Sequence, residues 1–251
     1  MTAQRYARPD GTELAYDLLP GAAPVVVFLP GYASDMGGTK AMFLRDACAG
    51  RDQAMLRLDY SGHGASGGKF EDGSIGIWTE DAARIIEAVT GGKSLILVGS
   101  SMGGWIALLL ALRFARRVES LLLVAPAPDF TEVLLLPKLS AEILEALDRD
   151  GVVYAPSEYG APLAYTKKLL DDGRDHLLLG GNIPVFCPVQ ILHGMRDDAV
   201  PWQHSLTISE CLQSEAVRIT FVKDGDHRLS RHEDLLLLRA SLLRLLGEDA
   251  A

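Results

Sequence analysis

Short, unbroken apolar runs recur along the chain, with stretches of helical periodicity between them. Runs of this length are typical of strands that are buried on both faces of a sheet. They lie at residues 24–29, 54–58, 95–98, 121–124, 189–192 and 217–222. Two further segments, residues 4–8 and 13–18, flank the turn signal Pro9-Asp10-Gly11 and predict a β-hairpin.

Helical periodicity is clearest at residues 78–89, 102–114, 201–212 and about 231–246. Strands that alternate with helices predict a mostly parallel sheet with helices on both faces. We therefore expect an α/β fold, with any chemistry at the carboxyl ends of the strands.

The segment between Pro126 and Pro184 contains no run typical of a core strand. A strand-free excursion of this length is more typical of an insertion than of a loop. Its leucine-rich stretches predict a helical cap at about residues 127–183, within a single domain that spans residues 1–251. Alternatively, these helices only enlarge the core.

The composition is that of a folded globular domain, with 251 residues, 48% hydrophobic residues and a mean hydropathy of +0.15. No apolar run approaches the ~18 residues that span a membrane, so we expect no stable membrane insertion. A net charge of −9 without a basic stripe argues against a nucleic-acid partner. The three cysteines are widely spaced and the N-terminal residues lack an apolar signal core, which favours a cytoplasmic location with reduced thiols.

The segment Gly99-Ser100-Ser101-Met102-Gly103 matches Gly-x-Ser-x-Gly between an expected strand and an expected helix. Such a sharp strand-to-helix turn exposes the central oxygen, and the glycines allow neighbouring backbone to pass close by. The register selects Ser101 as a nucleophile, because a match centred on Ser100 would need glycine at position 98, where the chain has valine.

Two rival motifs fail on their context. Residues 62–67 fit Gly-x-Gly-x-x-Gly, but no helix is expected to begin there, and the acid about twenty residues on, Asp81, lies within a helical pattern. Gly37-Gly38-Thr39-Lys40 has the residues of a phosphate-binding loop in the wrong order. We therefore expect no nucleotide cofactor.

A serine nucleophile needs a histidine base and an acid that orients the base. The loop after residues 189–192 carries Asp197, our preferred acid, and its neighbour Asp198 is an alternative. Asp129, which follows residues 121–124, is a second alternative. The expected chain order of serine, acid and histidine favours the later loop.

The preferred base is His227, because it follows the last expected strand, residues 217–222. His232, which is expected to begin the last helix, and His63 are alternatives. His193 is interpreted as structural. The six histidines are too dispersed to predict a metal site.

The oxyanion of an acyl-transfer reaction needs hydrogen-bond donors aimed at it. The backbone N–H of Met102, at the start of the expected helix after Ser101, is one candidate. The second candidate is the N–H of Tyr32, in the loop after residues 24–29.

Several longer motifs extend over nearly the whole chain. They are Leu29-Pro30-Gly31-Tyr32, Gly38-Thr39-Lys40-Ala41, Asp59-Tyr60-Ser61-Gly62, Gly99-Ser100-Ser101-Met102-Gly103-Gly104-Trp105, Pro156-Ser157-x-Tyr159, Ile183-Pro184-Val185 with Cys187-Pro188, His193-Gly194-Met195-x-Asp197-Asp198-x-Val200-Pro201-Trp202 and Asp226-His227-Arg228. With these motifs the chain resembles the α/β-hydrolase superfamily and, within it, the abhydrolase domain-containing protein ten group. We expect it to differ from the animal members at Met102, where they should have leucine, and in the absence of their mitochondrial presequence.

This resemblance implies a mostly parallel, eight-stranded sheet with a helical cap. It also implies a triad of Ser101, Asp197 and His227, with Tyr32 and Met102 as oxyanion donors. The family removes acyl groups from S-acylated protein cysteines and cleaves acyl glucuronides. The expected function is therefore a cofactor-free serine hydrolase acting on S-acylated proteins or small acyl thioesters and esters. The alternatives are a short-chain carboxylesterase and, outside enzymes, a ligand receptor on the same fold.

Overall fold

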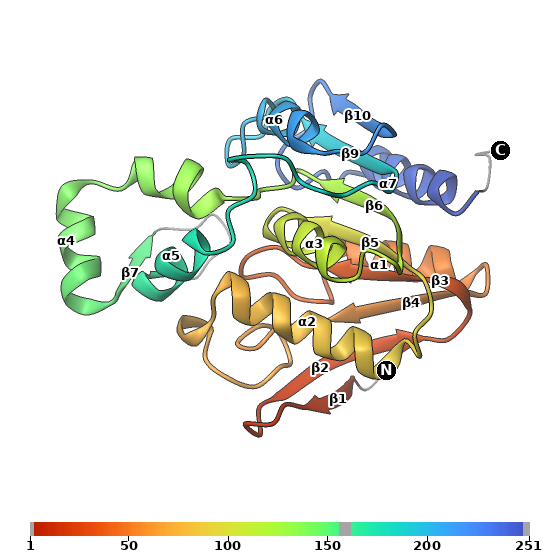
Figure 1. Ribbon diagram of the computed structural model, residues 1–251, viewed down its shortest axis with the longest axis horizontal. Helices are drawn as coiled ribbons and strands as arrows, with labels where there is room; N and C mark the ends of the chain where they lie inside the picture. The colour runs from red at the N-terminus through yellow and green to blue at the C-terminus, as the bar shows by residue number, and fades with distance from the viewer. Residues whose placement is uncertain (1–2, 156–161, 248–251) are drawn as a thin grey trace.

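The protein is built on an eight-stranded sheet with strand order β1-β2-β4-β3-β5-β6-β9-β10 (Figure 1). This computed structural model describes residues 3–155 and 162–247. The strands are β1 (Gln4–Ala7), β2 (Glu13–Leu19), β3 (Ala22–Leu29), β4 (Gln53–Leu58), β5 (Leu95–Ser100), β6 (Val118–Val124), β9 (Val189–Gly194) and β10 (Val217–Val222). Within this sheet of the described residues, only the β1–β2 and β2–β4 pairs are antiparallel, so the expected α/β class and mostly parallel sheet are confirmed.

The predicted hairpin and all six apolar runs correspond to strands of this sheet, and one prediction about burial is wrong. Residues 217–222 were expected to be buried on both faces, but β10 is an edge strand on which Arg218 and Thr220 are exposed. An edge strand with one solvated face alternates apolar and polar residues, and Val217, Ile219 and Phe221 are its less exposed positions.

Helices cover both faces of the sheet and create two hydrophobic cores. The helices are α1 (Thr39–Ala49), α2 (Ile75–Val89), α3 (Met102–Arg113), α6 (His204–Cys211) and α7 (His232–Leu245). Side chains of α2, α3 and α6, among them Trp78, Trp105 and Ile208, lie in one core. Leu44 of α1 and Leu238 of α7 lie in the other. None of the helices in the described residues is long and apolar enough to cross a membrane.

The sequence analysis did not anticipate helix α1. The face that α1 buries contains Ala41, Leu44, Arg45 and Cys48, so a charged residue interrupts the apolar pattern. Arg45 is accommodated there because its Nε donates to Asp17 of β2 over 2.9 Å. Such a pairing joins distant parts of the chain and cannot be read from local periodicity.

Residues 125–188, here called the β6–β9 segment, join β6 to β9, and α4, α5 and β7 within this segment lie beyond the carboxyl ends of the parallel strands (Figure 1). Their elements are a π-helical turn η2 (Thr131–Leu135), a 3₁₀ turn η3 (Leu136–Lys138), helices α4 (Ala141–Asp150) and α5 (Lys167–Arg174), and strands β7 (Val152–Ala155) and β8 (Leu163–Thr166). The segment that was predicted to be helical also contains two strands, because β7 and β8 form an antiparallel ribbon separate from the main sheet. The motif residues Pro156, Ser157 and Tyr159 lie outside the described residues.

Candidate active site

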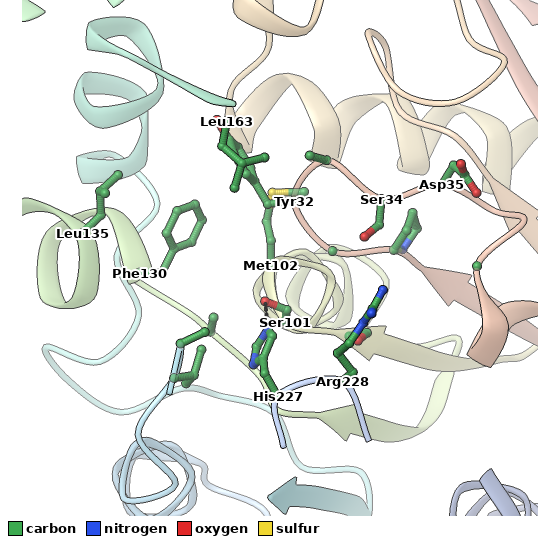
Figure 2. Close-up of a pocket in the computed structure, with 18 of the residues that line it drawn as sticks. Tyr32, Ser34, Asp35, Ser101, Met102, Phe130, Leu135, Leu163, His227 and Arg228 are labelled. Atoms are coloured by element: carbon green, nitrogen blue, oxygen red, sulfur yellow. Dashed lines mark hydrogen bonds between the residues drawn. The ribbon is translucent and has the colours of Figure 1, made fainter. Parts of the chain in front are cut away.

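Ser101 lies at the sharp turn between β5 and α3 (Figure 2). Its backbone has φ 54° and ψ −121°, a conformation that is strained for any residue with a side chain. The Ser101 N–H donates to the carbonyl oxygen of Val124 over 2.9 Å, and Gly104 N–H donates to the Ser101 carbonyl over 2.8 Å. These bonds hold the strained turn, and they place Ser101 as the N-cap of α3 with its side chain partly exposed.

The glycines of the motif are required by close backbone contacts. A Cβ atom at Gly103 would clash with the carbonyl oxygen of Leu29, and one at Gly99 would clash with the carbonyl of Gly103. A Cβ atom at Gly31 would lie 3.3 Å from the Ser101 Cβ. The absence of side chains at these positions therefore lets β3, β5 and α3 meet beside the Ser101 hydroxyl.

Three side chains from distant loops form a continuous chain of hydrogen bonds. Nε2 of His227 lies 3.1 Å from Oγ of Ser101, and its Nδ1 lies 2.7 Å from Oδ2 of Asp197. His227 follows β10 and Asp197 follows β9, so both lie on loops at the carboxyl ends of strands. This geometry allows the imidazole to take a proton from the serine hydroxyl while the carboxylate holds its tautomer.

The Asp197 carboxylate is fully buried but well supplied with donors. Its Oδ1 accepts hydrogen bonds from the N–H groups of Ala199 and Val200, at 2.9 and 2.8 Å. Burial by itself raises the pKa of Asp197, but the hydrogen bonds from His193 and His227 outweigh this and hold the pKa well below its ordinary value. Asp197 is therefore negatively charged near neutral pH, next to His227.

His193 also contacts this carboxylate. Its Nε2 lies 3.2 Å from Oδ2 of Asp197 and 3.0 Å from the carbonyl oxygen of Val200. Because both partners accept hydrogen bonds, Nε2 must carry the proton, and Nδ1 then accepts from the Ser205 hydroxyl 2.6 Å away. The sequence interpretation of His193 as structural missed its contact with Asp197.

The alternative acids do not reach His227. The Asp129 carboxylate accepts hydrogen bonds from the N–H groups of Leu178, at 2.8 Å, and Leu179, at 2.7 Å, which joins the start and end of the β6–β9 segment. Asp198 has an exposed side chain. Asp197 is the acid whose oxygen meets the His227 ring.

The alternative bases are also separated from Ser101. His63 is buried among Tyr60, Phe70 and Trp78, with ring centroids 5.0–5.5 Å apart. Burial lowers the pKa of His63 to about 4, so this ring stays neutral. His232 is the exposed first residue of α7, as expected.

A cavity of about 800 Å³ opens over Ser101 and His227. The side toward the β6–β9 segment is apolar, and Figure 2 shows Phe130, Leu135 and Leu163 there. The opposite side is polar and includes Ser34, Asp35 and Arg228 (Figure 2). The residues on the polar side of this cavity were not predicted from the sequence, and neither was Lys40 beside them. Lys40 and Arg228 do belong to motifs that follow strands.

Tyr32 joins the core to the β6–β9 segment. Its hydroxyl donates to the carbonyl oxygen of Ala164 in β8, and its ring stacks on Tyr165 with centroids 5.6 Å apart and planes within 4°. Tyr32 and Met102 both border the cavity. Because Met102 is the first residue of α3, its N–H has no acceptor within the helix. Their assignment as oxyanion donors remains a prediction.

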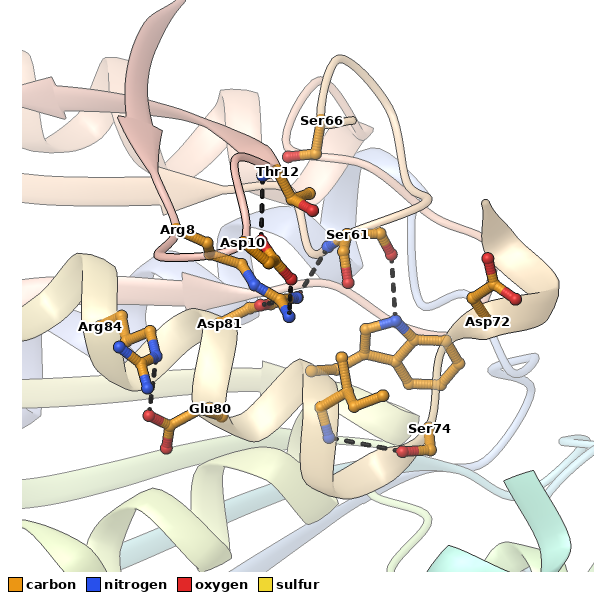
Figure 3. A network of polar contacts seen from close by, with 12 residues as sticks. Arg8, Asp10, Thr12, Ser61, Ser66, Asp72, Ser74, Glu80, Asp81 and Arg84 are labelled. Atoms are coloured by element: carbon orange, nitrogen blue, oxygen red, sulfur yellow. Dashed lines mark hydrogen bonds and ion pairs between the residues drawn. The ribbon is translucent and has the colours of Figure 1, made fainter. Parts of the chain in front are cut away.

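Buried aspartates position the loops around this cavity. Asp59, directly after β4, accepts hydrogen bonds from Met36 N–H at 2.7 Å and Ala65 N–H at 2.8 Å. The loop after β4 is further held by Asp81 of α2, which accepts from Ser61 N–H at 2.9 Å and pairs with Arg8 (Figure 3). The glycine-rich residues 62–67 therefore form a loop that leads to η1 (Phe70–Asp72). The carboxylate of Asp81 holds the start of this loop through its hydrogen bond to Ser61.

Within the described residues, no group of three or more His, Cys, Asp or Glu side chains is arranged to hold a metal ion. The arrangement around Ser101 needs none for acyl transfer, because the serine supplies the nucleophile and the histidine moves the proton.

Comparisons with known proteins identify relatives of this chain among hydrolases. The family described as "Serine aminopeptidase, S33" matches residues 21–185. The human protein "Palmitoyl-protein thioesterase ABHD10, mitochondrial" is 39% identical over 233 residues, which cover 92% of this chain and 76% of the human protein. Among solved structures, a putative hydrolase from Agrobacterium vitis S4 has a TM-score of 0.92 at 40% identity, covering 98% of this chain and 99% of that one. Mouse alpha/beta hydrolase domain-containing protein 10 has a TM-score of 0.90 at 34% identity, with the same coverage of both chains.

Proposed function

Because this chain belongs to the α/β-hydrolases, in the family described as serine aminopeptidase S33 and its abhydrolase domain-containing protein 10 group, it is a hydrolase, and we propose that it cleaves fatty acyl thioesters through an acyl-serine intermediate. The observation that carries the proposal is the hydrogen-bonded chain Ser101–His227–Asp197 at the floor of a partly apolar cavity. Membership of a hydrolase family argues against the receptor alternative.

In the first half-reaction, His227 Nε2 takes the proton of Ser101 as Oγ attacks the thioester carbonyl carbon. The negative charge that develops on the carbonyl oxygen is stabilised by the N–H groups of Met102 and Tyr32. Collapse of this intermediate breaks the carbon–sulfur bond. The leaving thiolate takes the proton from His227, and the acyl group stays on Ser101.

In the second half-reaction, His227 takes a proton from water, and the resulting hydroxide attacks the acyl-serine carbonyl. The carbon–oxygen bond to Ser101 then breaks, and His227 returns the proton to Oγ. The products are a fatty acid and the free enzyme. Asp197 remains ionised throughout and stabilises the imidazolium.

The β6–β9 segment acts as a cap that supplies the acyl site. Phe130, Leu135 and Leu163 line the apolar side of the cavity, next to Ser101. Each methylene group that moves from water to this surface contributes about 0.8 kcal/mol. Longer acyl chains should therefore bind more tightly until the apolar side is filled.

The names of the mammalian relatives support a thioester substrate, since they describe palmitoyl-protein thioesterases. The substrate would then be an S-acylated protein or a small acyl thioester. The same two half-reactions apply to activated oxygen esters, so acyl glucuronides are also proposed substrates. The expected cytoplasmic location remains a prediction, and the names of those relatives describe them as mitochondrial.

The test is hydrolysis of matched S-acyl-cysteine and O-acyl-serine peptides with acetyl, octanoyl and palmitoyl chains. We expect kcat/KM to favour the thioester and to rise with chain length. Ser101→Ala should abolish turnover and labelling by a fluorophosphonate. Ser100→Ala, which removes the neighbouring hydroxyl, is the matched control and should keep both.

Two outcomes would contradict the proposal. If a folded Ser101→Ala protein still turns over substrate, Ser101 is not the nucleophile. A tenfold preference for short oxygen esters, about 1.4 kcal/mol of transition-state free energy, would instead identify a short-chain carboxylesterase.

A further inference from the structure

The cavity has a second side that an acyl chain does not need. Seen from Ser101 and His227, the side with Ser34, Asp35 and Arg228 lies opposite Phe130 and Leu135 (Figure 2). If the acyl chain occupies the apolar side, the leaving group must depart toward the polar side. The side chains there therefore face the leaving group.

Two cations converge on this polar side. Lys40 borders the cavity, and its Nζ donates to the carbonyl oxygen of Arg228 over 2.6 Å. Arg228 directly follows His227 in the sequence, and it borders the same cavity as His227 and Lys40. Hydroxyl groups of Ser34, Thr39 and Ser230 border the same cavity.

The start of α1 adds to the positive potential here. Its first turn contains Thr39, Lys40 and Ala41 and has no acidic residue, and its N-cap, Gly38, has no capping side chain. Gly38 and Thr39 border the cavity themselves. The positive end of the helix dipole therefore acts in the same direction as the two side-chain charges.

The neighbouring carboxylates have other hydrogen-bond donors. Oδ2 of Asp234 pairs with Nε of Arg231 over 2.9 Å, and Oδ1 of Asp226 accepts from Leu229 N–H over 2.9 Å. Asp35, which borders the cavity, accepts from Gly37 N–H over 2.8 Å. Burial lowers the pKa of Lys40 to about 8, and the charge of Arg228 also lowers it, whereas Asp226 and Asp234 raise it. An added anion would therefore offset part of the cost of burying this ammonium group.

We propose that Lys40 and Arg228 bind a carboxylate on the leaving group, so that the preferred substrate is an S-acyl thiol whose sulfur lies a few bonds from a carboxylate. S-Acylated cysteine with a free α-carboxylate is one such thioester. An internal cysteine of a protein lacks this group, because its carboxyl carbon is part of a peptide bond. This inference rests on the proposed acyl-serine chemistry.

The test compares S-octanoyl-N-acetylcysteine with S-octanoyl-N-acetylcysteine amide. The two share the acyl chain and the thioester and differ in one negative charge. For the wild-type protein we expect kcat/KM to be about tenfold higher for the carboxylate, mostly through KM. Lys40→Met and Arg228→Gln should each reduce this ratio severalfold, and the double variant should bring it close to one. Lys40→Arg keeps the charge and should retain most of the preference.

Lys138→Met is the matched control. Lys138 borders the same cavity but belongs to η3 of the β6–β9 segment, next to the apolar side. Removing this charge should leave the carboxylate-to-amide ratio unchanged. If Lys138→Met and Lys40→Met lower the ratio equally, the preference arises from the general positive potential of the cavity. That result would overturn the inference of a local carboxylate site.

The source of the carboxylate is resolved by a second substrate pair, a pentapeptide ending in S-octanoyl-cysteine with either a free or an amidated C-terminus. The same preference in this pair would identify a chain end as an acceptable source, and a preference in the N-acetylcysteine pair alone would identify a small thiol. Equal wild-type rates on every carboxylate and amide pair would refute the anion site but leave the proposed hydrolase intact. If the wild-type protein hydrolyses none of these thioesters, the proposed function itself is refuted.

Discussion

His193 and His227 share one oxygen atom of Asp197. Oδ2 lies 2.7 Å from Nδ1 of His227 and 3.2 Å from Nε2 of His193. His193 is fully buried and held from its other side by Ser205, so it fixes the direction from which the carboxylate meets the base. His193 therefore acts on the candidate triad through Asp197, as a positioning residue.

The first prediction concerns this contact. His193→Leu removes the donor to a charged acceptor, a bond that contributes about 1.5–3 kcal/mol, and should lower kcat by about tenfold or more with little change in KM. His193→Gln can place an N–H near the same oxygen and should recover most of the loss. Steady-state kinetics of both variants, at equal folded fraction by circular dichroism, would measure this. Equal losses in the two variants would indicate a purely structural role.

The second prediction separates the three candidate acids. Asp197→Asn should lower kcat on the order of 10⁴-fold, because the amide no longer holds the His227 tautomer or stabilises its charge. Asp198→Asn should stay within about twofold of wild type, since its exposed side chain can exchange one polar group for another. Asp129→Asn should chiefly lower the melting temperature, since Asp129 accepts from Leu178 and Leu179. A large kcat loss confined to Asp129→Asn would reassign the acid.

The third prediction is a pH dependence of stability. The pKa of Asp197 in the folded protein lies below its ordinary value of 3.8, so its ionisation stabilises the fold above that pH. This contribution is lost as the pH falls below 3.8 toward the folded-state pKa. The excess unfolding free energy of wild type over Asp197→Asn should therefore be constant from pH 7 to 5 and shrink below pH 4. Urea titrations across this range, with Asp198→Asn as the reference, would measure it, and a pH-independent difference would contradict the assignment.

The fourth prediction concerns Lys40, whose pKa lies near 8 in an environment that includes the charges of Arg228, Asp226 and Asp234. Lys40 loses its positive charge as the pH rises through this value. The preference for the carboxylate substrate over its amide should therefore decline between about pH 7 and 9. Lys40→Arg should keep the preference across this range, since a guanidinium remains protonated. A wild-type ratio that is flat to pH 9.5 would contradict the prediction.

The fifth prediction concerns the link between Tyr32 and β8. Tyr32→Phe removes the hydrogen bond to the carbonyl of Ala164 but keeps the ring and the backbone N–H. We expect KM to rise a few-fold for palmitoyl substrates and kcat for acetyl esters to remain unchanged, because the cap loses one anchor while the oxyanion donors stay. Tyr154→Phe, which removes a bond between β7 and Glu71, is the control. A fall in acetyl-ester kcat for Tyr32→Phe would place the hydroxyl in the chemistry instead.

Local sequence determined the strands and the serine turn. Each apolar run forms a strand, and residues 99–103 form the turn, because apolar runs and glycine requirements are properties of a few neighbouring residues. The edge position of β10 and the ribbon β7–β8 were not predicted. Both depend on which strand lies alongside, which a local pattern does not contain.

The assignment of partners was decided by the tertiary structure. Ser101 and His227 are 126 residues apart, and sequence order alone left Asp129, Asp197 and Asp198 as candidate acids. The fold decides among these acids. Asp129 accepts hydrogen bonds from backbone N–H groups of its own segment, whereas Oδ2 of Asp197 lies within hydrogen-bond distance of His227. The division of the cavity into an apolar side and a cationic side arises in the same way. It depends on loops that follow different strands and meet only when the sheet brings their ends together.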